Sequence, residues 1–398
     1  MISEKMQNMV ANGSAIRAMF EEGNRLIQLH GAENVFDFSL GNPNVSAPVA
    51  VQTAIEEILN TEDAVTLHGY TNNAGYEDVR TAVAESINGK FDTHFAARNI
   101  IMTVGAAGGL NVILKTLLNP QDEVIVFAPF FGEYRNYVSN FDGMLVEISP
   151  NTENFQPKLD EFTSKITAKT KAVIVNTPNN PTGVVYSEET IQKLAVIMEE
   201  KQKELGIDIY MISDEPYREL VYDGVEVPYL TKYYQNTIVG YSYSKSLSLP
   251  GERIGYLVIP DEVTDADLVI EAATVANRIL GFVNAPTLQQ KLVRKCINEK
   301  TDVTYYNRNR ETLYNGLTEL GIECIKPEGA FYLFVKSPVE NELEFVQAAK
   351  KHNILMVAGR GFGCPGYVRM AYCVSYETIV NALPKFREVA KEFGLIKE

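Results

Sequence analysis

The sequence predicts an α/β protein with a large domain and a smaller one. The large domain is expected to hold a mostly parallel seven-stranded sheet with one reversed strand, flanked by helices. With 398 residues the chain is longer than a single hydrophobic core usually organises. From residue 100 short β-branched runs alternate with segments of helical periodicity, which is the pattern of a parallel sheet with helical crossovers. A second alternation of this kind begins after residue 320 and predicts the smaller α/β domain.

Seven apolar runs are expected to form the large sheet. They cover residues 100–104, 123–127, 145–148, 171–175, 209–212, 238–241 and 254–258. Helices are expected between them over residues 108–118, 159–166 and 188–205. The loop between the last two runs is too short for a helical crossover, so we expect the seventh strand to be antiparallel to its neighbour. Ligands in such sheets bind beyond the carboxyl ends of the strands.

The segments on either side of these runs have their own signals. Before residue 100, helices are expected over residues 14–29, 48–59 and 76–88, and a short strand over residues 35–40. Ser14 is a candidate cap for the first helix and Gly31 a stop signal. Gly41 is expected to open an irregular loop, and residues 67–75 are expected to form a polar, exposed separator between two helices. After residue 300, helices are expected over residues 301–320, 343–351 and 377–393, and strands over residues 331–335, 354–357 and 367–373.

The composition argues against several classes of protein. A formal net charge of -15 disfavours nucleic acid or an anionic membrane surface as the main partner. The four cysteines lie far apart without metal-ligand spacing, which indicates free thiols in a reducing cytoplasm and no metal site. The sequence has neither a secretory leader pattern nor an apolar run of membrane-spanning length. We therefore expect a cytoplasmic protein with small-molecule partners.

Residues 242–256 place one lysine among small hydroxyl residues, with an arginine eight positions later. Lys245 can attack a carbonyl only when its amine is neutral, which requires desolvation or a nearby cation such as Arg253. Serine hydroxyls, Ser242 among them, and a guanidinium also suit a phosphate group. A lysine beside a phosphate site suggests pyridoxal 5'-phosphate. In the alternative interpretation Lys245 is an ordinary loop lysine and Arg253 pairs with Glu252 at the surface.

Two further turns offer groups that suit such a cofactor. The glycine-rich turn over residues 104–110 follows a strand and opens a helix, so its backbone amides can face a phosphate. Such turns also occur merely for close packing. Residues 128–134 follow the next strand and place Phe130, Phe131 and Tyr134 where a flat ring could stack. We expect core packing for two of these three rings.

Polar residues follow or interrupt three other strands. An asparagine in the turn over residues 176–183 can donate to a phenolate oxygen. Asp214 ends a strand, where a carboxylate can keep a pyridine nitrogen protonated, and Tyr217 follows three residues later. The alternative role for Asp214 is a helix cap. Arg369 interrupts an apolar strand, where an unpaired charge is costly, so it needs an anionic partner from the protein or from a substrate.

Taken together, these motifs resemble the fold-type I pyridoxal-phosphate enzymes, and among them the class I/II aminotransferases of the aspartate aminotransferase type. The resemblance extends over nearly the whole chain. It rests on N-N-P-T-G over residues 179–183, D-E-x-Y over residues 214–217, S-x-S-K ending at Lys245 and the arginine eight residues later, in this order. The resemblance implies a homodimer whose two active sites are shared between the subunits.

The resemblance also implies a role for each matching residue. Lys245 resembles the Schiff-base lysine that shuttles the proton, Asp214 the partner of the pyridine nitrogen, and Phe131 the stacking ring. Tyr217 and Asn180 match donors to the phenolic oxygen of the cofactor. The residues that match the phosphate site are Ser242, Arg253, the amides of Ala106 and Ala107, and Tyr70 from the other subunit. Those that match the site for the substrate α-carboxylate are Arg369, Gly41 and Asn180.

Domain roles and the reaction follow from the same resemblance. Residues 1–45 would be an N-terminal segment packing with the small domain, residues 46–285 the large cofactor-binding domain, and residues 286–398 a linking helix and the small domain. An L-amino acid would pass its amine to the cofactor and leave as a 2-oxo acid, and a second 2-oxo acid would take the amine. We expect an aspartate-type enzyme with 2-oxoglutarate as the acceptor.

Other substrates and activities remain open at this point. Ala107 stands where one group of acidic-substrate enzymes has a lysine, and Arg278 is one residue out of register with an arginine of another group. Arg278 and Arg360 are the candidates for a distal carboxylate. Aromatic or other neutral amino acids are the alternative substrates. A carbon-sulfur lyase of the same fold would typically have a histidine where Pro216 stands, and a transcription regulator is disfavoured because no basic segment precedes residue 30.

Overall fold

The structure is a computed structural model that describes residues 2–11, 13 and 15–397. Its α-helices are α1 (Glu4–Ala11), α2 (Ala15–His30), α3 (Val49–Thr61), α4 (Ala64–His68), α5 (Glu77–Phe91), α6 (Gly105–Leu117), α7 (Tyr134–Asn140), α8 (Leu159–Lys165), α9 (Glu188–Leu205), α10 (Tyr243–Ser246), α11 (Ala266–Ile279), α12 (Thr287–Lys295), α13 (Val303–Glu319), α14 (Glu342–Lys351) and α15 (Tyr376–Glu392). Its strands are β1 (Phe36–Asp37), β2 (Ile100–Thr103), β3 (Glu123–Phe127), β4 (Met144–Ile148), β5 (Thr170–Asn176), β6 (Tyr210–Asp214), β7 (Thr237–Ser242), β8 (Gly255–Val258), β9 (Tyr332–Lys336), β10 (Ile354–Leu355), β11 (Val357–Ala358) and β12 (Tyr367–Ala371). Within the described ranges no helix is long and apolar enough to cross a membrane.

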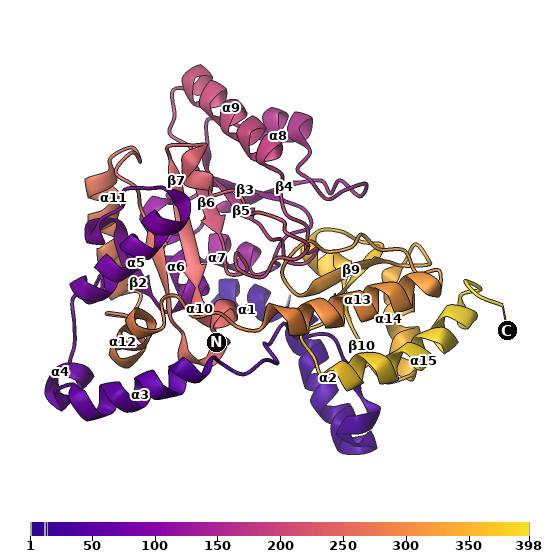
Figure 1. Cartoon of the computed structure of the whole chain (residues 1–398). Coiled ribbons are helices and arrows are strands. Elements are labelled where there is room, and N and C mark those ends of the chain that lie inside the picture. Colours follow the sequence, from indigo (N-terminus) through magenta and orange to yellow (C-terminus); the bar gives the residue numbers. More distant parts are fainter. Residues whose placement is uncertain (1, 12, 14, 398) are drawn as a thin grey trace.

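A seven-stranded sheet with helices on both faces forms the larger part of the molecule (Figure 1). Its strand order is β2-β8-β7-β6-β5-β3-β4. β8 is antiparallel to both β2 and β7, and the remaining pairs are parallel. The predicted sheet with one reversed strand is therefore confirmed.

Alternate residues of the central strands reach opposite helix layers. In β3, Val124 and Val126 pack in one apolar cluster with residues of α6, α7 and α11. Ile125 and Phe127 belong to another cluster, with residues of α8 and α9. All four side chains are buried. Because both faces of the sheet are covered, its strands are apolar at nearly every position, which explains the continuous runs in the sequence.

Local signals set the ends of the longer helices. α9 begins after Ser187, whose Oγ accepts a hydrogen bond from the Thr190 amide at 3.1 Å. It ends at Leu205, and Gly206 follows with a φ of 65°, which glycine adopts without a Cβ penalty. α15 begins in the same way after Ser375, which accepts from the Thr378 amide. These signals explain why the bounds of both helices agree with the prediction.

The C-terminal part forms a smaller α/β layer that also holds the N-terminal segment. Its sheet has the order β11-β12-β9 and is antiparallel, with α13, α14 and α15 contributing to the same apolar core. β1 pairs in parallel with β10, and Leu26 and Val35 pack against Leu355. α12 instead packs with α3 and α5, through Leu292 and Val293 among others. This packing places α12 with helices of the large domain, and the division at residues 45 and 285 stays a prediction.

Several predicted elements differ from the observed ones. α4 was not predicted; Asp63 caps it by accepting from the Thr66 amide, and Leu67, expected in an exposed separator, is only 2% exposed. The strand predicted over residues 35–40 shrinks to the two residues of β1. The strand predicted over residues 354–357 is split, because β10 pairs with β1 whereas β11 pairs with β12. The cap predicted at Ser14 lies outside the described residues.

Candidate active site

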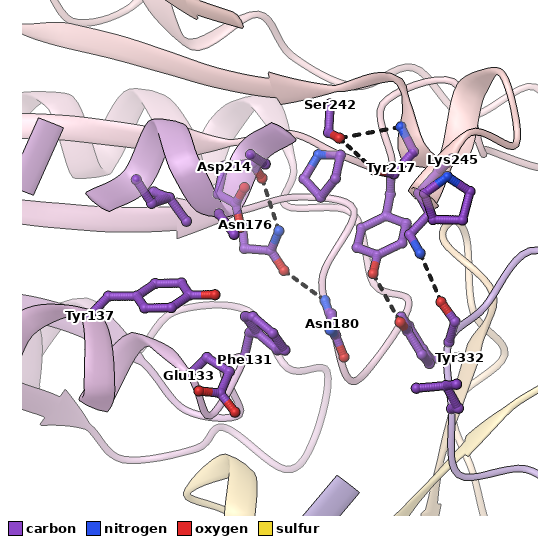
Figure 2. Close-up of a pocket in the computed structure, with 18 of the residues that line it drawn as sticks. Phe131, Glu133, Tyr137, Asn176, Asn180, Asp214, Tyr217, Ser242, Lys245 and Tyr332 are labelled. Atoms are coloured by element: carbon purple, nitrogen blue, oxygen red, sulfur yellow. Dashed lines mark hydrogen bonds between the residues drawn. The ribbon is translucent and has the colours of Figure 1, made fainter. Parts of the chain in front are cut away.

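A cavity of about 590 Å³ opens where β5, β6 and β7 end at their carboxyl termini. Figure 2 shows residues that line it. Among them are these predicted site residues: Gly41, Ala106, Ala107, Phe131, Asn180, Asp214, Tyr217, Ser242, Lys245, Arg253 and Arg369. Tyr70 is not one of the lining residues and is 90% exposed on the loop after α4. The fold thus gathers residues from seven separate segments of sequence at the ligand edge of the sheet.

Lys245 lies on the single turn of α10, directly after β7. Ser242 caps this turn by accepting from the Ser244 amide at 3.2 Å. The Lys245 Nζ donates to the Gly41 carbonyl at 2.7 Å. Burial, which disfavours the charged amine, lowers its pKa to about 8, and the positive charges of Arg253 and Arg369 act in the same direction. The amine is therefore much more often neutral than that of an exposed lysine, as a nucleophile requires.

Asp214 ends β6, and one oxygen of its carboxylate has a hydrogen-bond partner whereas the other has none among the described residues. The Tyr134 hydroxyl donates to Oδ2 at 2.5 Å. Oδ1 is buried and has no hydrogen-bond partner in the part of the chain that the structure describes. Burial raises the pKa of Asp214 to about 6, while the bond from Tyr134 opposes that rise. No helix follows Asp214, so the alternative role of a helix cap is wrong, and the unpaired oxygen is open to a cationic donor from a ligand.

Arg369 lies on β12 and is 1% exposed. Its guanidinium donates to the Asn180 Oδ1 at 3.1 Å and to the Ser39 carbonyl at 2.5 Å, and the rings of Tyr332 and Phe362 flank it. Nε has no partner, and no carboxylate of the described residues forms an ion pair with Arg369. Burial lowers the pKa of Arg369. A buried guanidinium held only by neutral acceptors suits an incoming carboxylate.

Arg253 and the start of α6 form the other end of the cavity. Arg253 has a φ of 53° and donates to the carbonyls of Pro250, at 2.9 Å, and Val104, at 3.2 Å. Gly105 has a φ of 78°, and a Cβ there would lie 2.9 Å from a guanidinium nitrogen of Arg253. The guanidinium therefore lies against the first turn of α6, which offers free amides to an anion. Glu252 accepts from Gln289 instead, so the alternative of a surface pair with Arg253 is wrong.

Comparisons with known proteins agree with this geometry. The model of the family described as "Aminotransferase class I and II" matches residues 33–386. The chain belongs to this aminotransferase family. It is 30% identical to aromatic-amino-acid aminotransferase 2 of Thermococcus litoralis, in a match that covers 99% of this chain and 100% of that protein.

Solved structures give the same result. An amino transferase from Eubacterium rectale is 48% identical with a TM-score of 0.96, and the match covers 99% of each chain. The aspartate aminotransferase of Thermus thermophilus with maleate is 28% identical with a TM-score of 0.87, and the match covers 98% of this chain and 99% of that one. The predicted family, fold and cofactor are thereby confirmed: the chain is an aminotransferase that uses pyridoxal phosphate.

The cavity fits this cofactor on three observations. The free Oδ1 of Asp214 needs a donor, which a protonated pyridine nitrogen supplies. The amine of Lys245 has the low pKa that attack on an aldehyde requires. Gly105 leaves the space beside Arg253 that a phosphate group requires. Each would be hard to explain in an ordinary surface cleft.

The aromatic residues of the aminotransferase divide as predicted between core and cavity. Phe131 lines the cavity, whereas Phe130 and Tyr134 are 2% and 1% exposed and belong to the core. In the view of Figure 2, Phe131 and Tyr137 lie opposite Asp214. The buried ring of Tyr134 nevertheless contributes to the site through its hydroxyl, which the sequence did not reveal.

Other residues of the aminotransferase site had no sequence signal. Tyr332 follows no motif, but its hydroxyl lies 2.9 Å from that of Tyr217. Asn176 was part of a quoted turn, and its side chain links the Asp214 carbonyl to the Asn180 amide, at 2.9 and 2.7 Å. The other cavity residues that were missed include Phe20 and Glu21 of α2, Leu40, Glu133 and Tyr137. Glu133 lies within the turn over residues 128–134, where the sequence analysis considered only the aromatic residues.

The two arginines considered for a distal carboxylate do not line the cavity of their own chain. Arg360 forms an ion pair with the fully buried Glu342, with Nε 2.7 Å from Oε1, and donates to Asn341. This pairing disfavours Arg360 as a substrate ligand. Arg278 is exposed near the end of α11.

Proposed function

We propose that this aminotransferase transfers the amino group of L-aspartate to 2-oxoglutarate, with both substrates using the same cavity in turn. The observation that carries the proposal is the pairing of a lysine of low pKa with a buried guanidinium that lacks a carboxylate partner among the described residues. The guanidinium of Arg369 would hold the α-carboxylate as a bidentate pair, and Gly41 and Asn180 would complete that site. The α-carbon would then lie within reach of Lys245.

The residues proposed to hold the cofactor divide by the part of it they contact. Phe131 would stack on the ring, Asp214 would pair with the pyridine nitrogen, and Tyr217 and Asn180 would donate to the phenolic oxygen. The phosphate would be held by Ser242, Arg253 and the amides of Ala106 and Ala107. When bound, the cofactor supplies an electron sink for the pair of electrons left on the substrate α-carbon. Lys245 would take the α-proton on Nζ and return it, because its pKa of about 8 allows both states near neutral pH.

An acidic substrate needs a further cation beyond those of the cavity. Lys245, Arg253 and Arg369 already have roles in this proposal, and Arg360 is held by Glu342. We therefore propose a homodimer in which Arg278 of the second copy contacts the distal carboxylate and Tyr70 of the second copy contacts the phosphate. Support comes from Val49, Val65 and Tyr70, which are 84%, 82% and 90% exposed, as residues of an interface between copies would be in one chain. The Thermus enzyme is described with maleate, a dicarboxylate.

Aromatic or other neutral amino acids are the second candidate substrates. Phe20 and Leu40 add apolar surface to the cavity, and the Thermococcus relative is named for aromatic amino acids. A carbon-sulfur lyase of the same fold remains the alternative activity, but no residue of the cavity favours it. The four cysteines, which are unpaired, support the proposed cytoplasmic location.

A substrate panel tests these proposals. Enzyme loaded with pyridoxal phosphate is mixed with aspartate, glutamate, alanine or phenylalanine alone, and the absorbance of the cofactor reports the first half of the reaction. The converted enzyme is then mixed with 2-oxoglutarate, pyruvate or oxaloacetate. We expect the highest kcat/KM for aspartate and 2-oxoglutarate. A preference for phenylalanine would support the second candidate, and release of pyruvate from a sulfur amino acid without conversion of the cofactor would support the lyase.

A further inference from the structure

A hydrogen-bonded chain of three side chains lies behind the lysine, outside the active-site cavity. The Tyr241 hydroxyl is 2.8 Å from the Glu219 Oε2 and 2.8 Å from the Ser246 Oγ. None of these three residues lines the active-site cavity; all three line a separate space of about 30 Å³. Ser246 follows Lys245 directly in the sequence. The hydrogen-bonded series of side chains therefore ends on the turn that carries the reactive amine.

The conformation of the turn that carries Lys245 depends on contacts with residues outside the turn. α10 has only four residues, and a helix of one turn has little stability by itself. Ser242 caps it from the cavity side. From the other side the Thr301 amide donates to the Ser246 carbonyl at 3.0 Å, and the Tyr241 hydroxyl holds the Ser246 side chain. The direction in which the Lys245 side chain leaves the backbone therefore depends on these contacts.

The ring of Tyr241 packs against other aromatic rings, whereas its hydroxyl forms hydrogen bonds. The ring stacks on that of Tyr256 at 4.8 Å and meets that of Tyr243 edge-on at 5.2 Å. A phenol has a single proton, so when Tyr241 donates to the carboxylate of Glu219 its oxygen accepts from Ser246. Glu219 thereby sets the direction of both hydrogen bonds. Tyr241 and Ser246 are 3% and 5% exposed, so water cannot readily replace either bond.

We propose that Tyr241, oriented by Glu219, is a positioning residue that holds the turn of Lys245 and so sets where its Nζ lies between the cofactor and the substrate α-carbon. The proposal rests on the proposed function, because a precise position of this amine matters only if Lys245 bonds the cofactor and moves the α-proton. Small displacements of such a group are costly, since about 1 Å of misplacement can lower a rate roughly a hundredfold. The hydroxyl is expected to affect chemistry at Lys245 and to leave the fold intact.

The test compares Tyr241→Phe with Tyr243→Phe. Both keep an aromatic ring in the same cluster, but within the described part of the chain the Tyr243 hydroxyl has no hydrogen bond to the Lys245 turn. The first readout uses enzyme freed of cofactor: the rate at which added pyridoxal phosphate links to Lys245 is measured against pH by absorbance. In wild type this profile should rise through the lysine pKa of about 8. Tyr241→Phe should shift that profile and slow the linkage, whereas Tyr243→Phe should follow wild type.

The second readout separates position from binding. In the half-reaction with the best amino acid of the panel, Tyr241→Phe should lower kcat roughly tenfold to a hundredfold with little change in KM. Ser246→Ala should reproduce this loss, and the double variant should lose no more than either alone, because both remove one contact. If Tyr241→Phe fails to fold, Ser246→Ala carries the test. Wild-type linkage and half-reaction rates in Tyr241→Phe or Ser246→Ala would overturn the proposal. A wild-type enzyme that converts no amino acid would overturn the proposed function instead, and the linkage profile would still test Tyr241.

Discussion

The Tyr134 hydroxyl donates to one oxygen of the Asp214 carboxylate at 2.5 Å, and the other oxygen is buried with no partner among residues 2–11, 13 and 15–397. Burial raises the pKa of Asp214 to about 6 and the bond from Tyr134 opposes the rise. The two residues thus keep a deeply buried carboxylate ionised near neutral pH, with its free oxygen directed to a ligand. A pyridine nitrogen that must stay protonated needs such a partner.

This relationship predicts how cofactor binding depends on pH. Asp214 carries its charge only above its pKa, so the affinity of the cofactor-free enzyme for pyridoxal phosphate should fall as the pH drops through about 6. Tyr134→Phe removes a bond that lowers this pKa, so the fall should begin at a higher pH. Titration of the bound cofactor by absorbance at several pH values measures both effects. Tyr186→Phe, which alters another buried tyrosine away from the cavity, is the control and should match wild type. An unchanged profile in Tyr134→Phe would show that its hydroxyl does not influence Asp214.

Lys245→Ala should bind pyridoxal phosphate without a covalent link. Both the link and the proton transfer depend on the same amine, so turnover should fall by roughly a hundredfold to ten-thousandfold or more. The enzyme should lose the absorbance of the linked cofactor, and mass spectrometry after borohydride treatment should find no modified lysine. Lys115→Ala removes an exposed lysine and serves as the control. Wild-type turnover in Lys245→Ala would rule out the assigned role.

How much of this site the sequence could predict depends on how far apart in the sequence the interacting residues lie. Asp214 and Lys245 follow strands whose apolar runs are visible in the sequence, and the carboxyl ends of parallel strands meet at one edge. The hydroxyl contact between Tyr217 and Tyr332 joins residues 115 positions apart, and no local pattern specifies such a pair. The partner of Arg360 was equally hidden, because the burial of Glu342 depends on how α14 packs against β11 and β12.

The fold was predictable from the sequence for the same reason. The prediction failed where the existence of an element depends on pairing with a segment distant in the sequence. Most strands of the large sheet are buried on both faces and stand out as apolar runs, whereas the edge strand β4 is partly exposed. β1 and β10 are two residues each and exist only because they pair with one another across the chain. α4 has only five residues, is capped by Asp63 and runs directly into a polar stretch with two glycines over residues 69–75, so its sequence resembles the start of a loop.

If Arg278 of the second copy contacts the distal carboxylate of an acidic substrate, replacing Arg278 and replacing Arg360 should have different effects. Arg278→Leu should lower kcat/KM for aspartate and glutamate much more than for alanine, because a desolvated carboxylate loses its charged partner. Arg360→Leu is the matched comparison. It should affect the three amino acids alike and lower the melting temperature, since it leaves the fully buried Glu342 unpaired. Kinetics with the three substrates and thermal unfolding of both variants measure this. Equal losses for all substrates in Arg278→Leu would remove Arg278 from the proposed role.

If two copies share their active sites, dimers that combine two inactive variants should recover activity. Tyr70 is 90% exposed and does not line the cavity of its own chain, so a role in cofactor binding requires a second copy. Chains with Tyr70→Ala and chains with Lys245→Ala are mixed, unfolded and refolded, and activity is compared with that of each parent. In a mixed dimer, the site that keeps Lys245 would receive an intact Tyr70 from its neighbour and become active. Affinity for the cofactor should recover with it, since a lost hydrogen bond to the phosphate costs about 0.5 to 3 kcal/mol. If mixed dimers form, as shown by differently tagged chains, and activity does not exceed that of the parents, Tyr70 does not serve the neighbouring site.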